Sequence, residues 1–149
     1  MTDCFVCRKH AGAIVAPGGA LYEDELVYAS RMVLDDQPRV YLGTLFVEPK
    51  RHVAGIGDLT RPEAERVGWL TSRLAAALRA SERAEHVYTF VLGHHVPHLH
   101  VWVVPRYPGT PPEYAPFRLA AWPDAPRGGE PEIGALCDRV RAQLAQTGV

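Results

Sequence analysis

Histidine is concentrated in one short segment of the chain. Four of the seven histidines lie between residues 94 and 100, at His94, His95, His98 and His100. Imidazole has an ordinary pKa close to neutral, so it serves as a nucleophile, an acid–base group or a metal ligand. Such clustering is uncommon on a surface without a function, and it indicates that this segment carries chemistry.

The residues that follow have the alternation of a β-strand. Because successive side chains of a strand point to opposite faces, residues 98–104 place His98, His100 and Trp102 on one face. The opposite face is uniformly apolar, with Leu99, Val101 and Val103. A strand of this kind predicts a core on one side of a sheet and a functional site on the other.

A second group of possible ligands lies near the start of the chain, where Cys4 and Cys7 form a Cys-x-x-Cys pair. The sequence has three cysteines and no secretory signal, so metal binding or burial is expected rather than a disulfide framework. A redox pair would follow a strand, whereas only three residues precede Cys4. His10 extends the spacing to Cys-x-x-Cys-x-x-His and is one possible further ligand. The third cysteine, Cys137, falls on the apolar face of a predicted helix and is expected in the core.

Composition limits the classes of partner. The chain has 149 residues, is 47% hydrophobic and 22% charged, and has a formal net charge of −1, which is typical of one globular domain. Without a basic excess, neither a nucleic acid nor a membrane surface is expected as a partner. No segment resembles a signal peptide or a bilayer-spanning helix, so a cytoplasmic location is expected. A small phosphorylated ligand remains compatible with a neutral protein.

The hydrophobic periodicity predicts strands at residues 21–22, 26–33, 40–47, 87–92 and 98–104. A long helix is predicted after Thr60, which has capping-box spacing with Glu63. Residues 106–131 are rich in proline and glycine and are expected to form an irregular arm, and residues 132–146 a final helix. This order predicts an α+β fold in a single domain, 1–149, with its core in residues 1–105.

Residues 98–106, His-Leu-His-Val-Trp-Val-Val-Pro-Arg, resemble the signature of the histidine triad superfamily, His-x-His-x-His followed by two apolar residues and often Pro-Arg. The resemblance extends to Leu-Tyr-Glu-Asp-Glu at residues 21–25 and to residues 43–52, which end in Pro-Lys-Arg-His. It implies an antiparallel five-stranded sheet with one long helix and a C-terminal helix, pairing as a homodimer. It also implies a nucleotide as the small-molecule ligand.

In this resemblance His100 takes the place of the central histidine, the nucleophile that attacks the α-phosphorus of a nucleoside 5′-phosphate derivative. Trp102 stands where the third histidine of the family is found. His94 and His95, which follow Gly93, take positions that contact phosphate oxygens and the leaving group in the family. Either of them is therefore a possible donor in place of the missing histidine.

The family's ribose-binding aspartate has no clear counterpart. Counting forward from Tyr22 places Met32 at that position, whereas counting back from Gly43 places Asp36 there. Asp35 and Asp36 are thus the candidates for nucleotide binding, together with Gly93. A polar turn is the alternative interpretation of the two aspartates.

The resemblance also implies a structural zinc site. Many bacterial members carry an N-terminal Cys-x-x-Cys, completed by the histidine of Pro-Lys-x-His and the first histidine of the signature. Those positions here are Cys4, Cys7, His52 and His98, with His10 as the competing fourth ligand. A Cys₂His₂ set with no open position is typical of structural rather than catalytic zinc.

Three functions follow from the sequence. The first is a nucleotidyl hydrolase or transferase that forms a nucleotidyl-histidine at His100. The second is a weak or inactive nucleotide-binding protein, because the indole of Trp102 donates a hydrogen bond but exchanges no proton. The third is a zinc-stabilised structural domain.

Overall fold

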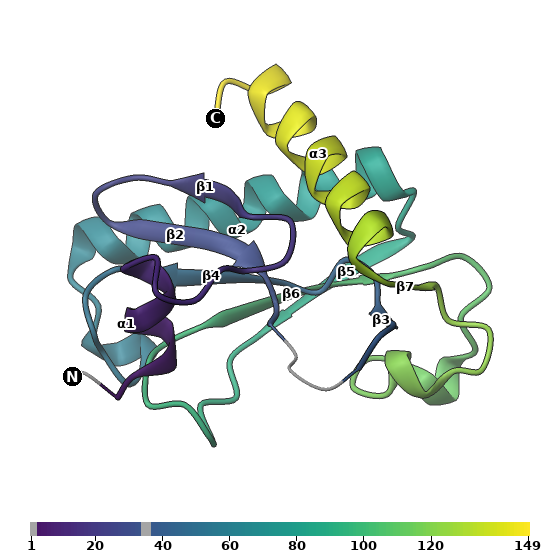
Figure 1. Cartoon of the computed structure of the whole chain (residues 1–149), viewed down its shortest axis with the longest axis horizontal. Helices are drawn as coiled ribbons and strands as arrows, with labels where there is room; N and C mark the ends of the chain where they lie inside the picture. The colour runs from purple at the N-terminus through teal and green to yellow at the C-terminus, as the bar shows by residue number, and fades with distance from the viewer. Residues whose placement is uncertain (1–2, 34–36) are drawn as a thin grey trace.

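The computed structural model describes residues 3–33 and 37–149, so the candidates Asp35 and Asp36 lie outside the described residues. Its main sheet has five antiparallel strands in the order β1-β2-β4-β6-β5, as predicted for an α+β fold (Figure 1). The strands are β1 (Ala20–Glu23), β2 (Val27–Arg31), β4 (Leu45–Pro49), β5 (His86–Phe90) and β6 (Val101–Arg106). The helices are α1 (Phe5–His10), α2 (Arg61–Glu82) and α3 (Glu130–Gln146).

The long helices α2 and α3 pack on one face of the sheet, and the short helix α1 packs on the other. The main core joins α2 and α3 to the strands and includes Leu70, Leu74, Val101 and Val103. On the other face, α1 lies against β2 and β4, where Lys9 contacts Ser30. Because both faces are covered there, every residue of β2 is buried. The site described below lies on the face that α1 covers only in part.

The start of α2 is fixed as its sequence predicts. The carboxylate of Glu63 accepts hydrogen bonds from the backbone N–H and the hydroxyl of Thr60, at 2.8 and 2.9 Å. Arg51 donates to both oxygens of the same carboxylate, at 2.8 and 2.7 Å. The helix cap is therefore tied to the loop that follows β4.

The limits of all five predicted strands shift in the structure, and two of the strands differ most. The single strand expected over 40–47 is divided into β3 (Val40–Tyr41) and β4, and β3 pairs with β7 (Arg127–Gly128) in a separate two-stranded sheet. The break comes at Gly43, whose φ of +88° is one that side chains other than glycine rarely adopt. A Cβ there would also lie 2.7 Å from Cγ of Pro105. The strand expected to begin at His98 begins at Val101, although the predicted alternation of faces holds.

Two further segments are more ordered than the sequence suggests. Residues 5–10 form α1, although no helix was expected at the Cys-x-x-Cys pair. The proline-rich arm contains the short 3₁₀ helices η2 (Pro112–Tyr114) and η3 (Leu119–Ala121), besides β7. A third, η1 (Ile56–Asp58), precedes α2. Within the described part of the chain, none of the helices combines the length and apolarity that crossing a bilayer requires.

Candidate functional site

His100 lies immediately before β6 with its ring held by the backbone. Its Nδ1 is 2.8 Å from the carbonyl oxygen of His98. A carbonyl oxygen only accepts hydrogen bonds, so Nδ1 carries the proton and Nε2 keeps a free lone pair. The ring is partly buried and packs edge-on against Phe46, with ring centroids 5.2 Å apart. With its proton on Nδ1, the uncharged ring has Nε2 as its one nucleophilic nitrogen.

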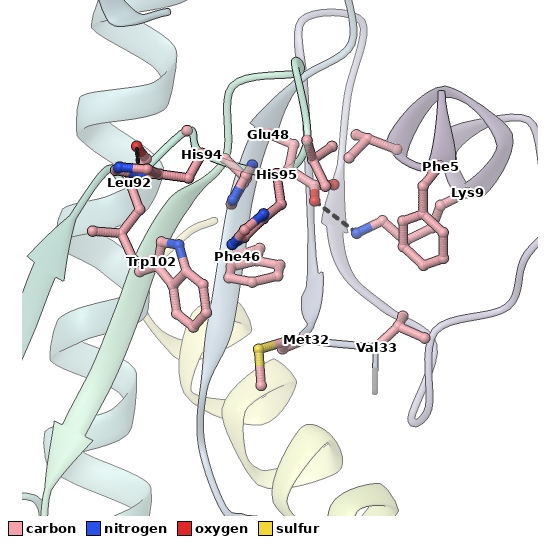
Figure 2. Close-up of a pocket in the computed structure, with 14 residues that line it drawn as sticks. Phe5, Lys9, Met32, Val33, Phe46, Glu48, Leu92, His94, His95 and Trp102 are labelled. Carbon is pink, nitrogen blue, oxygen red and sulfur yellow. Dashed lines mark hydrogen bonds and ion pairs between the residues drawn. The ribbon is translucent and has the colours of Figure 1, made fainter. Parts of the chain in front are cut away.

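A cavity of about 440 Å³ opens beside this ring (Figure 2). Its lining is mainly apolar and comes from α1, from the end of β2, from β4 and β6, and from the loop before His100. The apolar contributors are Phe5, Val6, Met32, Val33, Phe46, Leu92 and Val96. A cavity of this size and character, with a few convergent polar groups, is typical of a small-molecule site.

Polar side chains reach the cavity from two sides, with His94, His95 and Trp102 on the loop of residues 93–96 and on β6, and Lys9 and Glu48 on α1 and β4. His94 and His95 line it and lie in an exposed part of the loop, and Nδ1 of His94 is 2.9 Å from the carbonyl oxygen of Leu92. Gly93, also in the lining, turns the chain with a φ of +68°. The structure thus brings His94, His95 and Gly93 to the same cavity as His100.

Trp102 forms the end of the cavity next to His100. Its indole packs against Phe46 at 4.7 Å and stacks on Phe90 at 5.5 Å between ring centroids. Its Nε1 atom is buried and has no hydrogen-bond partner among the described residues. Leaving a buried donor unpaired costs free energy, and this N–H is a group for which the described part of the protein supplies no acceptor.

The side of the cavity formed by α1 was not predicted from the sequence. Lys9 is buried and its Nζ lies 2.7 Å from Oε1 of Glu48, while Nε2 of His10 lies 2.9 Å from Oε2 of the same carboxylate. Burial alone would raise the pKa of Glu48, but the contacts with His10 and Lys9 outweigh it and hold that pKa below its usual value. The charges compensate one another inside the protein and fix α1 against β4. In the sequence, only the alternation of Phe46, Val47 and Glu48 could have indicated that Phe46 and Glu48 share one face of β4.

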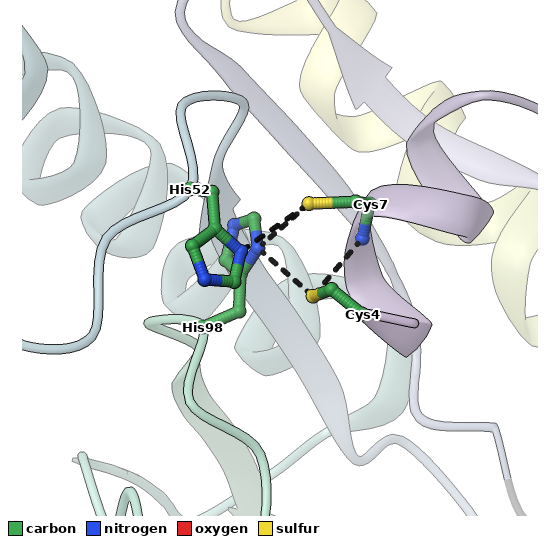
Figure 3. Close-up of side chains that lie close together, drawn as sticks. All are labelled: Cys4, Cys7, His52 and His98. Atoms are coloured by element: carbon green, nitrogen blue, oxygen red, sulfur yellow. Dashed lines mark hydrogen bonds between the residues drawn. The ribbon is translucent and has the colours of Figure 1, made fainter. Parts of the chain in front are cut away.

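The four predicted metal ligands come together at the start of α1 (Figure 3). One ligand atom from each of Cys4, Cys7, His52 and His98 lies within 4.8 Å of the others. Nδ1 of His98 is 3.5 Å from both sulfurs, and Nδ1 of His52 is 3.4 Å from Sγ of Cys7. Around a tetrahedral zinc ion with bonds of about 2.0–2.3 Å, neighbouring ligand atoms are roughly 3.5 Å apart. The residues therefore fit zinc in type and in spacing.

His98 is oriented for this cluster by its other nitrogen. Its Nε2 lies 2.8 Å from the carbonyl oxygen of Pro49, so Nε2 carries the proton and Nδ1 presents its lone pair to the two sulfurs. The residue is completely buried, and burial lowers its pKa, which favours the neutral ring that a metal requires. His10, the alternative ligand, contacts Glu48 instead. Cys137 lies in the core, as expected.

Comparison with known proteins agrees with this geometry. The family model described as the HIT domain matches residues 14–109, well over half of the chain. Among solved structures, a zinc-bound histidine triad family protein from Mycobacterium smegmatis has a TM-score of 0.74 at 24% identity, covering 99% of this chain and 96% of that one. A hypothetical histidine triad nucleotide-binding protein from Sulfolobus tokodaii has a TM-score of 0.73 at 18% identity, covering 96% and 93%.

A member of the HIT family from Bacillus subtilis is also similar, with a TM-score of 0.61 at 26% identity over 72% of this chain and 75% of that one. None of the curated proteins compared with the chain matches it. Members of this family are generally nucleotide-binding proteins, hydrolases or transferases. The sequence signature, the fold and the family match agree, and the chain belongs to the HIT domain family.

Proposed function

We propose that the protein is a nucleotidyl hydrolase or transferase that attacks the α-phosphorus of a nucleoside 5′-phosphate derivative through Nε2 of His100. The supporting observation is the contact of 2.8 Å between Nδ1 of His100 and the carbonyl oxygen of His98, beside a cavity of about 440 Å³. A neutral imidazole in a fixed tautomer is an effective nucleophile near pH 7. Attack would give a nucleotidyl-histidine, which water or an acceptor then resolves.

The two ends of the cavity suit the two parts of such a substrate. Phe5, Val6 and Val33 offer apolar contacts to a base and a sugar. His94, His95 and the unpaired Nε1 of Trp102 lie toward the phosphate end, where donors stabilise the charge that develops on the phosphoryl oxygens. Met32 offers no carboxylate to the ribose, and Asp35 and Asp36, which we propose for that contact together with Gly93, lie outside the described residues.

Proton transfer to the leaving group is assigned to His94 or His95. In the family the histidine at the third triad position assists at the phosphate. The indole N–H of Trp102 donates a hydrogen bond but cannot act as a general acid at neutral pH. Both loop histidines line the same cavity as His100, and an imidazole is suited to general-acid work near pH 7. Trp102 would then act as a fixed donor, and one of the two histidines as the acid.

We further propose a structural zinc ion held by Cys4, Cys7, His52 and His98. The spacing of the ligand atoms supports it, as does the zinc-bound histidine triad protein from Mycobacterium smegmatis among the structural neighbours. With four protein ligands, such a site leaves no position open for substrate. It would remove His98 from the chemistry and clamp α1 to the sheet. Free thiols at this site also suit the reducing conditions of the cytoplasm, the location that we propose.

Turnover of a fluorogenic adenosine phosphoramidate tests the reaction. We expect His100→Ala to lower kcat by at least about a thousandfold, because the nucleophile is lost. His86→Ala is the matched control, since His86 is an exposed histidine on β5 outside the cavity. Nucleotide binding with no turnover in the unmodified protein would favour the second candidate, a nucleotide-binding protein. The presence of Trp102 in place of the third histidine supports this candidate. Failure to bind any nucleotide would leave only the structural role.

A further inference from the structure

A second cavity, of about 540 Å³, lies next to the first one. Three residues line both cavities: Met32, Leu92 and Trp102. Along β6, His100 belongs to the first cavity and Val104 to the second, and Trp102 lies between them on the same face of the strand. The two cavities therefore meet over Trp102, two residues from the proposed nucleophile.

The outer wall of the second cavity comes from the proline-rich arm. Phe117 of this arm packs edge-on against Phe90 at 5.3 Å, and Phe90 in turn stacks on Trp102 at 5.5 Å and 18°. Although it takes part in this aromatic row, Phe117 is 70% exposed, and Leu92 is 48% exposed. Large apolar side chains gathered at the mouth of a cavity indicate a surface that is covered when a ligand binds.

The charges of the second cavity exclude a strongly anionic ligand. Of the described residues that line it, none is acidic, and Arg127 is the one basic side chain. Its guanidinium already donates to the backbone carbonyl oxygens of Trp122 and Ala120. Several phosphate groups in one site require several free cationic or N–H donors. The cavity therefore suits an uncharged aromatic or alkyl group better than a second nucleotide with its phosphates.

We propose that this second cavity binds the leaving group of the substrate and that this group has an aromatic or alkyl body. The inference rests on the proposed function of His100. In the first step, Nε2 of His100 forms a bond to phosphorus, and the bond from phosphorus to the leaving nitrogen or oxygen breaks. The leaving atom takes a proton from His94 or His95. Water then breaks the bond between His100 and phosphorus, supplying hydroxide to phosphorus and a proton to the enzyme.

During the first step the body of the leaving group lies in the second cavity, against the row of aromatic rings formed by Trp102, Phe90 and Phe117. A substrate of this class is a nucleoside 5′-phosphate joined to an apolar amine or alcohol. Burying the apolar group contributes binding energy that a small leaving group lacks, and a hydrophobic pocket of this kind discriminates by about tenfold or more. The arm thus determines specificity for the leaving group, while the cavity beside α1 holds the nucleoside.

Two adenosine 5′-phosphoramidates test this assignment, one made with cyclohexylmethylamine and one with methylamine. The two amines are similarly basic, so their chemical reactivity is matched. We expect kcat/KM for the bulky amide to exceed that for the small one by about tenfold or more. Phe117→Ala should reduce this ratio at least about threefold. Val15→Ala, which truncates another exposed apolar side chain outside both cavities, should leave the ratio unchanged.

Dissociation constants separate a failure of this subsite from a failure of the proposed reaction. They are measured for both amides on His100→Ala, which lacks the nucleophile. Equal kcat/KM values in the unmodified protein overturn the subsite and leave nucleotidyl transfer intact. If the unmodified protein turns over neither amide but the bulky one binds more tightly, the reaction is wrong and the subsite stands. Equal dissociation constants in a protein without turnover overturn the subsite as well.

Discussion

At the scale of single residues, His98 connects the metal cluster to the proposed nucleophile. Its Nδ1 faces the sulfurs of Cys4 and Cys7, its Nε2 contacts Pro49, and its carbonyl oxygen accepts the hydrogen bond from His100. A completely buried ring with both nitrogens engaged holds its own backbone in place. The contact with that backbone fixes the tautomer of His100, and we therefore propose that the first histidine of the signature is a positioning residue.

Trp102 gives the first prediction at this scale. We expect Trp102→Phe to keep the aromatic packing against Phe46 and Phe90 but to remove the unpaired N–H. If this N–H donates to a phosphoryl oxygen in the transition state, kcat should fall by about a hundred- to a thousandfold, since loss of one such donor has effects of this order. Steady-state kinetics on the fluorogenic phosphoramidate measure the change.

Trp69→Phe is the matched control, because Trp69 packs against Tyr22 and Arg66 on the far side of the sheet from the cavity. The kcat of Trp69→Phe should equal that of the unmodified protein. An unchanged kcat in Trp102→Phe, by contrast, would show that the phosphoryl oxygens depend on other donors, such as His94 and His95.

At the scale of elements, α1 has two functions that a helix of six residues rarely combines. One side of it faces the metal cluster through Cys7, and another forms the wall of the cavity through Phe5, Val6 and Lys9. A helix this short is unstable by itself, so its position depends on tertiary contacts. Those contacts are the proposed zinc ion and the buried pair of Lys9 and Glu48.

Loss of the metal should therefore loosen the nucleotide site. We expect Cys4→Ser to lose the zinc, to increase hydrogen exchange over residues 5–10 and to weaken nucleotide binding, because structural zinc contributes about 10 kcal/mol or more to the folding of small metal sites. Metal content is measured by elemental analysis and binding by calorimetry. Protection of the amides of α2 shows whether the rest of the fold persists.

His10→Ala is the matched control for the zinc site, since His10 contacts Glu48 rather than the cysteines. It should retain about one zinc ion per chain. Loss of zinc in His10→Ala, with zinc retained in His98→Ala, would show that the competing ligand set is the true one.

The cap of α2 gives a prediction about pH. The hydrogen bonds from Arg51 and Thr60 lower the pKa of Glu63 from an ordinary value of 4.5 to about 2. Because the folded pKa lies below the unfolded one, the stabilisation is complete above the unfolded pKa and is lost as the pH falls toward 2. We expect Glu63→Gln to destabilise the protein by about 1–2 kcal/mol at pH 7.

Thermal unfolding of Glu63→Gln and of the unmodified protein between pH 2 and pH 7 measures this difference. The difference between the two proteins should shrink toward the acid end, as Glu63 becomes protonated in the folded state as well. Glu65→Gln is the control, because Glu65 is exposed and its one ion pair among the described residues is with the exposed Arg61. A difference between Glu63→Gln and the unmodified protein that stays constant over this range would contradict the assigned pKa.

At the scale of the whole molecule, the sheet ends in β5 on one side, and we propose that two copies pair along this edge. The other edge strand, β1, has an irregular register and is contacted by α3, so it is less open to pairing. Val91, which directly follows β5, is an apolar residue with 37% of its surface exposed. Light scattering should give about twice the mass of one chain. A monomeric mass at micromolar concentration would overturn the dimer.

Much of the molecule could be predicted from local sequence. Alternation over residues 98–104 indicated which side of β6 meets the core, and the spacing of Thr60 and Glu63 located the start of α2. Both patterns depend on residues that lie close together in the sequence, because strand alternation and helix capping are local features. The residue types of the histidine cluster and the Cys-x-x-Cys pair likewise limited the chemistry before any contact was known.

Other features depended on contacts between distant parts of the chain. The division of residues 40–47 follows from the close approach of Gly43 to Pro105, and the pairing of Lys9 with Glu48 joins residues 39 positions apart. Local sequence does not predict a buried lysine, because a buried charge is tolerated only where the fold supplies a partner of opposite charge. The sequence by itself determined the alternating faces, the helix cap and the types of ligand. Only the tertiary structure decided that α1 forms the wall of the site, because helix formation over six residues requires a surface on which to pack.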